Sequence, residues 1–119
     1  MEEFKGTPGK WGFSHSSASD SSTACIEITS TESLHEVAYL QSTPSNIGRY
    51  EPTSFDRTIA NAHLISAAPE LLDSLQRYMS SVQQMNEAMN DGYNVQGAMS
   101  ALIGSEDMAK AAIDKALGK

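Results

Sequence analysis

The chain has 119 residues, a length that suits one hydrophobic core, so we expect a single domain over residues 1–119. Its net charge of −7 disfavours direct binding to nucleic acid or to an anionic membrane, and its one cysteine, Cys25, excludes an intrachain disulfide and a thiolate zinc site. No apolar stretch approaches the ~20 residues that cross a bilayer, and the first residues do not resemble a signal peptide, so we expect a soluble intracellular protein.

The two halves of the chain differ in composition, and this difference predicts the fold class. Residues 1–52 carry β-branched residues, prolines and serines, whereas residues 53–119 are rich in Ala, Leu, Met, Gln and Glu. Apolar residues repeat at the strand period of two in the first part and at the helix period in the second. We therefore predict an α+β fold, in which a small antiparallel sheet of about three strands precedes two long helical segments.

Three short segments of the β-rich part are expected to be strands, namely residues 10–14, 23–29 and 35–41. Residues 14–23 are rich in serine, lack large apolar side chains and predict a hairpin loop. Residues 43–52 contain two prolines and a glycine, which interrupt a strand and predict a long irregular connection to the helical part. Long ordered loops in small domains are often functional, so this connection is the more interesting of the two.

The helical part is expected to begin near Ser54, with Thr53 or Ser54 as the N-cap. Pro69 interrupts the helical pattern, and it predicts either a kink near Ala68 or a new helix with Pro69 in its first turn. Gly92 accepts the left-handed conformation that often ends a helix, so we expect this segment to stop there.

The last third of the chain, residues 94–117, is the second helical segment. Glycine weakens a helix, and this segment contains Gly97 and Gly104. Ser105 is followed directly by two acids, a pattern typical of a new N-cap and first turn. We therefore expect a break near Gly104.

Apolar residues three and four positions apart form a stripe along the first helical segment. They are Leu64, Ala68, Leu71, Leu75, Tyr78, Val82, Met85 and Met89. This stripe presents more apolar surface than three strands can cover, so we expect a homo-oligomer. The alternative is that the C-terminal helix covers the stripe in an antiparallel hairpin.

Little in the sequence points to catalysis. No nucleophile motif, glycine-rich phosphate loop or pair of histidines at metal-ligand spacing is found, so we expect no enzyme activity, catalytic residue, metal or cofactor. A phosphate ligand would need the scarce basic residues gathered in one place. We predict Arg49, Tyr50, Arg57 and Arg77 as ligand-binding residues, with arginines for phosphate and tyrosine for a base, although Arg49 could be solvated and Tyr50 a packing residue. Asp73 is expected to form an exposed ion pair with Arg77.

Two segments resemble a widespread family of small phage-encoded accessory proteins. They are residues 4–11, FKGTPGKW, and residues 60–72, ANAHLISAAPELL. In that family a Thr-Pro-Gly-x-Trp entry into a β-meander precedes an Ala-Asn-Ala-x-Leu-Ile-x-Ala-Ala-Pro-Glu-Leu-Leu helix. Lys10 stands here where a proline often precedes the tryptophan. The resemblance implies a structural scaffold, in which small alanines let the helix lie close to the sheet.

The resemblance also implies a setting, the cytoplasm of an infected bacterial host, where some such proteins counter bacterial immunity. The order of strands and long helices is similar to that of anti-Thoeris sponge proteins, which implies a protein that sequesters a cyclic nucleotide immune signal without cleaving it. One alternative is an anti-CRISPR or other inhibitor that binds a host defence protein through an acidic surface, and another is a housekeeping accessory protein. The candidate acids are Glu27, Glu36, Glu70, Asp73, Glu87 and Asp91.

Overall fold

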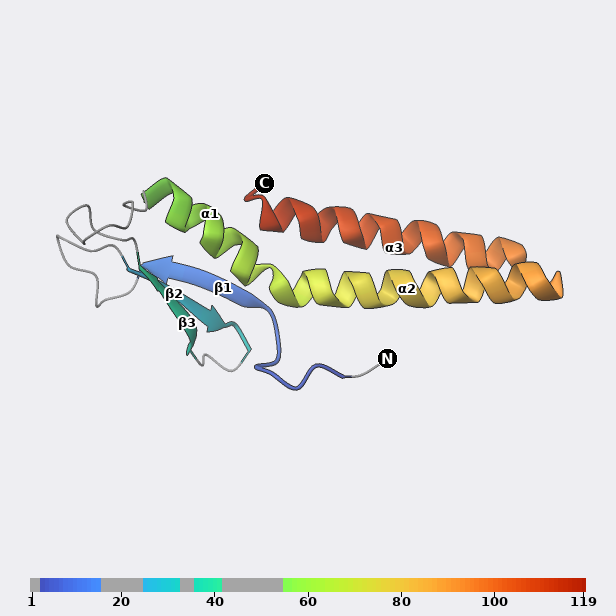
Figure 1. Cartoon of the computed structure of the whole chain (residues 1–119), viewed down its shortest axis with the longest axis horizontal. Helices are drawn as coiled ribbons and strands as arrows, with labels where there is room; N and C mark the ends of the chain where they lie inside the picture. Colours follow the sequence, from blue (N-terminus) through green and yellow to red (C-terminus); the bar gives the residue numbers. More distant parts are fainter. Residues whose placement is uncertain (1–2, 16–24, 33–35, 42–54) are drawn as a thin grey trace, which may run out of the picture.

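The structure, a computed structural model, describes residues 3–15, 25–32, 36–41 and 55–119, and it confirms the α+β fold class. A three-stranded antiparallel sheet precedes three helices (Figure 1). The strands are β1 (Trp11–His15), β2 (Cys25–Ser30) and β3 (Glu36–Gln41), and the helices are α1 (Phe55–Ser66), α2 (Ala68–Asp91) and α3 (Val95–Ala116). The predicted loop over residues 43–52 and most of the one over residues 14–23 lie outside the described residues, as do Thr53 and Ser54.

The sheet has the order β1-β2-β3, and its central strand supplies the core. Ile26 and Ile28 of β2 are fully buried, as their alternation along the strand predicts. Helix α1 covers this face of the sheet with Ala62, which is also fully buried. A small side chain at this position lets the helix lie close to the strands, so the alanine-rich motif acts as a packing element.

The helical part breaks at Ala67. Helix α1 ends at Ser66 and α2 begins at Ala68, with Pro69 in its first turn, where a proline loses no helical hydrogen bond. The Ala67 amide donates to the carbonyl oxygens of His63 at 3.1 Å and Leu64 at 3.2 Å, which closes the last turn of α1. Of the two alternatives predicted at Pro69, the structure therefore has a new helix.

Helix α3 is continuous, so the expected break near Gly104 is wrong. A Cβ built on Gly104 would meet nothing within 4 Å, which places this residue on an open side of the helix. Ser105, expected to cap a new helix, is instead buried, and its hydroxyl donates to the Leu102 carbonyl oxygen at 2.7 Å. The ~1 kcal/mol that a glycine costs a helix is offset here by packing against α2 on either side of Gly104.

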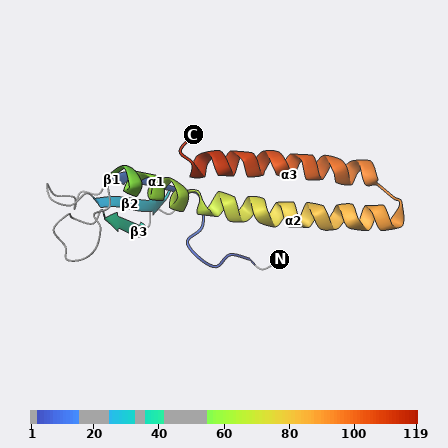
Figure 2. The same ribbon diagram turned by 45° about the horizontal axis from the view of Figure 1, so that its top comes forward.

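Helices α2 and α3 form an antiparallel hairpin that projects away from the sheet (Figures 1 and 2). Gly92 ends α2 with φ 65°, as predicted, and the chain turns directly into α3. The radius of gyration is 19.2 Å, compared with about 13.5 Å for a compact chain of this length. No helix within the described ranges is both long and apolar enough to cross a membrane. Among the described residues, most of the hairpin packs only against itself.

Candidate functional site

The predicted ligand-binding residues are not gathered within one copy of the chain, as far as the structure describes them. Arg49 and Tyr50 lie outside the described residues. Arg57 lies in the first turn of α1 and Arg77 lies in α2, each ten residues and so about 15 Å from the break at Ala67. The two helices run from the break in different directions (Figure 1). Arg77 donates from Nε to Asp73 Oδ2 at 3.2 Å, which confirms the exposed ion pair expected from the sequence.

Small residues seven positions apart form the contact line between α2 and α3, which we call the seam. The seam consists of Ser74, Ser81 and Ala88 of α2 and Ala98, Ser105 and Ala112 of α3, all buried. The serine hydroxyls donate to carbonyl oxygens of their own helices, for example Ser81 to Arg77 at 2.9 Å. Their hydrogen-bonding capacity is therefore satisfied without separating the helices. The pattern of large apolar residues in the sequence does not reveal this repeat of small ones.

The large residues of the predicted stripe lie beside the seam and remain accessible. Leu75 is 60% exposed, Tyr78 37% and Met89 64%. The C-terminal helix thus forms the alternative hairpin but covers the stripe only in part, because Leu71, Val82 and Met85 are half-buried. Side chains of α3 continue the same surface, which we call the apolar face. It comprises Leu71, Leu75, Tyr78, Val82, Met85 and Met89 of α2 and Val95, Met99, Leu102, Ala109 and Ile113 of α3.

A groove of about 350 Å³ lies in the apolar face, near the base of the hairpin. It is lined by Leu71, Ser74, Leu75, Tyr78, Ala109 and Ile113. The groove forms because Ala109 of α3 lies opposite large residues of α2. Its lining carries no charged side chain, so it suits an apolar partner and not a phosphate.

The opposite surface of the hairpin, the polar face, combines acids of α2 with small residues of α3. Its hollow near the base, about 340 Å³, is lined by Lys10, Glu70, Asp73, Ser74, Met108, Ala111, Ala112 and Lys115. A neighbouring hollow joins residues of the N-terminal segment to α2. The N-terminal segment and the start of β1 therefore pack on this side of the hairpin.

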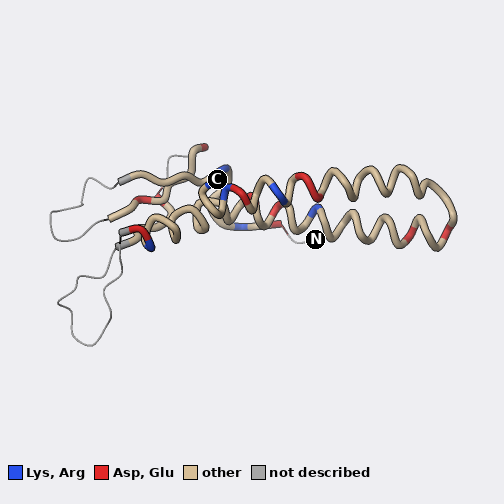
Figure 3. The backbone as a smooth tube through the Cα atoms, turned by 90° about the horizontal axis from the view of Figure 1, so that it is seen from above, with Lys and Arg blue, Asp and Glu red and all other residues tan. Residues whose placement is uncertain are grey.

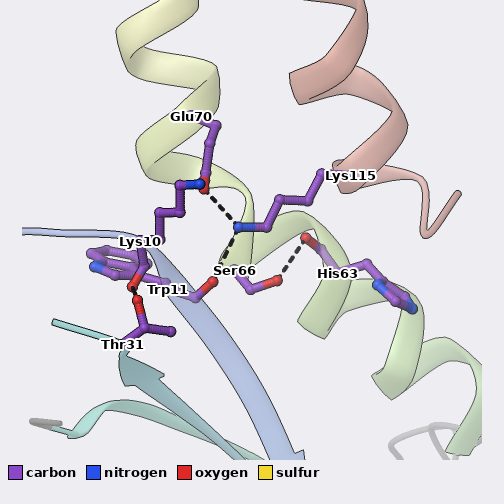
Figure 4. A network of polar contacts seen from close by, with 7 residues as sticks. All are labelled: Lys10, Trp11, Thr31, His63, Ser66, Glu70 and Lys115. Atoms are coloured by element: carbon purple, nitrogen blue, oxygen red, sulfur yellow. Dashed lines mark hydrogen bonds and ion pairs between the residues drawn. The ribbon is translucent and has the colours of Figure 1, made fainter.

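Lys115 holds the base of the hairpin to the sheet (Figure 4). Its ammonium donates to Glu70 Oε1 at 2.7 Å and to the Trp11 carbonyl oxygen at 3.1 Å, which joins α3 to α2 and β1. The Trp11 indole in turn donates to the Thr7 carbonyl oxygen at 3.1 Å, and the Ser30 hydroxyl donates to the Pro8 carbonyl oxygen at 2.7 Å. The Thr-Pro-Gly-Lys-Trp segment thus has a structural role, because its residues connect the sheet to the base of the hairpin.

The one histidine of the helical part also has a structural environment. His63 packs edge-on against Phe13, with 4.9 Å between ring centroids, and lies close to Gly118. Within the described ranges, no group of three His, Cys, Asp or Glu residues has the spacing to hold a metal ion. His63 is thus a packing residue that ties α1 to the sheet.

Comparison with known proteins supplies a family. A search of curated proteins and a search of solved structures each returned no match. A family model described as Salmonella phage P22 protein Y8K6 matches residues 1–119. This match supports the phage origin that the resemblance implied. It does not test the two motifs or the similarity to anti-Thoeris sponge proteins. The chain thus belongs to the Salmonella phage P22 protein Y8K6 family and is a small phage-encoded protein.

Proposed function

We propose that the chain is a non-enzymatic phage accessory protein that counters a host defence by binding a host protein with the tip of its hairpin. The observation that carries this proposal is Tyr93, which is 80% exposed in the turn between α2 and α3. A tyrosine presents a large amphipathic surface with few rotatable bonds, and such residues are frequent anchors of protein interfaces. A hollow of about 260 Å³ lies beside Tyr93 and is lined by Gln84, Glu87, Ala88, Asp91, Asn94 and Ala98 as well.

The charges of the tip favour a basic partner surface. Near the base of the hairpin, Glu70 pairs with Lys115 and Asp73 pairs with Arg77. Glu87 and Asp91 form no ion pair with a described residue, and acidic but no basic segments are seen at the far end of the hairpin (Figure 3). Uncompensated acids steer a positively charged partner and fix its register. This supports the inhibitor alternative, with Glu87 and Asp91 as its acids.

The test is capture of a host protein by the tip, followed by reconstitution with that protein in purified form. We expect Tyr93→Ala, and separately Glu87→Gln with Asp91→Asn, each to weaken binding by roughly tenfold or more, and binding to fall as salt rises. The matched control is Asp107→Asn with Asp114→Asn, the same charge change on exposed positions of α3. Equal loss in the control, or no purified host protein that binds, would contradict the proposal.

Sequestration of a cyclic nucleotide is the second candidate function. It is favoured by Arg57, which is exposed in the first turn of α1, where the helix N-terminus also attracts phosphate. Arg49 and Tyr50 precede Arg57 closely in sequence, and a second copy of the chain would have to supply Arg77. A thermal shift with a cyclic nucleotide that is released intact on heating, and is bound less tightly by Arg57→Ala, would favour this function over the first. No shift with any nucleotide would exclude it.

A further inference from the structure

The apolar face is uncovered in a single copy of the chain. Besides Leu75, Tyr78 and Met89, Met99 is 43% and Ile113 is 50% exposed. The N-terminal segment and β1 lie on the other side of the hairpin, and no described part of the chain packs over this face. With half-exposed side chains along two helices, the face offers on the order of 800 Å², more than the ~300–600 Å² patch of an ordinary monomer.

The size, charge and shape of this face identify its partner. An area on the order of 800 Å² on each side is what a stable dimer of standard size buries. Helices that lie on anionic membranes are rich in Lys and Arg. The apolar face contains neither, and it is interrupted by Glu106, which lies seven residues from both Met99 and Ile113. A membrane surface is therefore disfavoured as the partner.

The face is also complementary in shape to a second copy of itself. Its half near the base of the hairpin is hollow over Ala109, and its half near the tip carries Met85, Met89 and Met99. Methionine side chains are flexible and fill irregular gaps well. If two hairpins meet with their tips at opposite ends, the methionines of each fill the hollow of the other.

We propose that the apolar face binds the same face of a second copy, with the two hairpins antiparallel, to form a four-helix bundle. Successive residues of a helix are about 100° apart. Leu75, Val82 and Met89 each directly follow a seam residue, so they are rotated away from the seam and point toward the partner. Leu71, Tyr78 and Met85, rotated by less, fill the centre of the bundle. Val82 lies near the middle of α2 and so near the two-fold axis.

Glu106 opposes this association, because it also faces the partner and would lose water on binding. Glu106 directly follows the seam residue Ser105, so it is rotated by about 100° from the seam, toward the partner. Asp107, which follows Glu106, points away from both the seam and the partner. Removing a charge that is desolvated in a complex strengthens that complex. The two neighbouring acids therefore form a matched pair for testing the interface.

The experiment is sedimentation velocity of the full chain up to about 100 μM, with far-UV circular dichroism of each variant. We expect the wild type to sediment as a species with twice the 12.8 kDa mass of one chain. Leu75→Asp should raise the dimer dissociation constant by roughly 100-fold and keep its helicity, because Leu75 is already exposed in the monomer, whereas Ser80→Asp, at an exposed position on the other side of α2, should change little. Glu106→Leu should lower the constant roughly tenfold, and Asp107→Leu should not.

Disulfide trapping tests the orientation of the two copies. Val82→Cys should form an intermolecular disulfide under mild oxidation, because the two residues meet near the two-fold axis, whereas Tyr93→Cys, at opposite ends, should not. A monomer at about 100 μM would overturn the proposal, as would equal effects of the paired substitutions. Crosslinking through Tyr93→Cys alone would overturn the antiparallel arrangement. If the tip variants lose binding to the host protein but still form the dimer, this inference holds independently of the proposed function.

Discussion

Replacing Lys115 with methionine tests the contact that holds the hairpin to the sheet. Methionine keeps the unbranched apolar stem and removes the charged donor. Glu70 Oε1 and the Trp11 carbonyl oxygen then lose their common partner. Glu70 Oε2 is buried and already lacks a hydrogen-bond partner among the described residues, so the substitution leaves a half-buried carboxylate with no ion pair in the described part of the chain.

The exposure of the two side chains sets the expected magnitude. The Lys115 side chain is 35% exposed and that of Glu70 is 25% exposed, so the pair is neither a surface pair nor a buried one. Exposed pairs contribute ~0–1 kcal/mol, and removal of one partner from a buried pair costs ~3–5 kcal/mol. We therefore expect Lys115→Met to lower the free energy of unfolding by about 1–3 kcal/mol, after allowing for solvent screening.

Urea unfolding followed by circular dichroism at one fixed protein concentration measures this effect. Arg77→Met is the matched control, because it breaks a pair whose side chains are 62% and 53% exposed. The control should cost less than about 0.5 kcal/mol. A double-mutant cycle of Lys115→Met with Glu70→Gln isolates the interaction between the two side chains. If Lys115→Met and Arg77→Met lose the same small amount, Lys115 does not join the hairpin to the sheet and the reasoning fails.

Three further predictions concern the seam, the turn and the sheet. Ser81 is 8% exposed on the seam, so Ser81→Leu should separate the helices and lower the free energy of unfolding by about 1–3 kcal/mol, whereas Ser80→Leu, on an exposed position, should change it by less than about 0.5 kcal/mol in thermal unfolding. Gly92 has φ 65° with open space around it, so Gly92→Ala should cost about 1 kcal/mol from backbone strain alone, and no loss would contradict the left-handed cap. Hydrogen bonding to Glu36 raises the pKa of Tyr39 from 10.0 to about 12, so this stabilising contribution is present below pH 10 and is lost as pH rises toward 12. Ultraviolet titration should show that Tyr39 ionises at a lower pH in Glu36→Gln than in the wild type.

The strands and the main helix ends could be predicted because each depends on local chemistry. The alternation around Ile26 and Ile28 marks a strand with one buried face, and Gly92 marks a helix end whatever the rest of the chain does. The predicted break near Gly104 was wrong because the helix propensity of a single residue has only a weak effect. Helix α2 is distant from Gly104 in the sequence, and its contacts with α3 keep α3 continuous.

The two faces of the hairpin could be predicted only in part. The sequence predicts the stripe that contains Leu75 and Tyr78, and it leaves open whether a second copy or the C-terminal helix covers it. The actual line of contact consists of buried Ser and Ala residues, and hydrophobicity alone does not distinguish them from exposed small residues. Their spacing of seven in both α2 and α3 is the signal that could have located the seam. The tip could not be found from the sequence, because the exposure of Tyr93 depends on how the hairpin closes.

The most direct test is the mass of the protein in solution, measured by light scattering at about 50 μM for the wild type and two variants. The wild type and Tyr93→Ala should both have twice the mass of 12.8 kDa, since the tip is separate from the apolar face, and Leu75→Asp should have 12.8 kDa. A wild-type mass of 12.8 kDa at this concentration would contradict the claim that a second copy covers the apolar face.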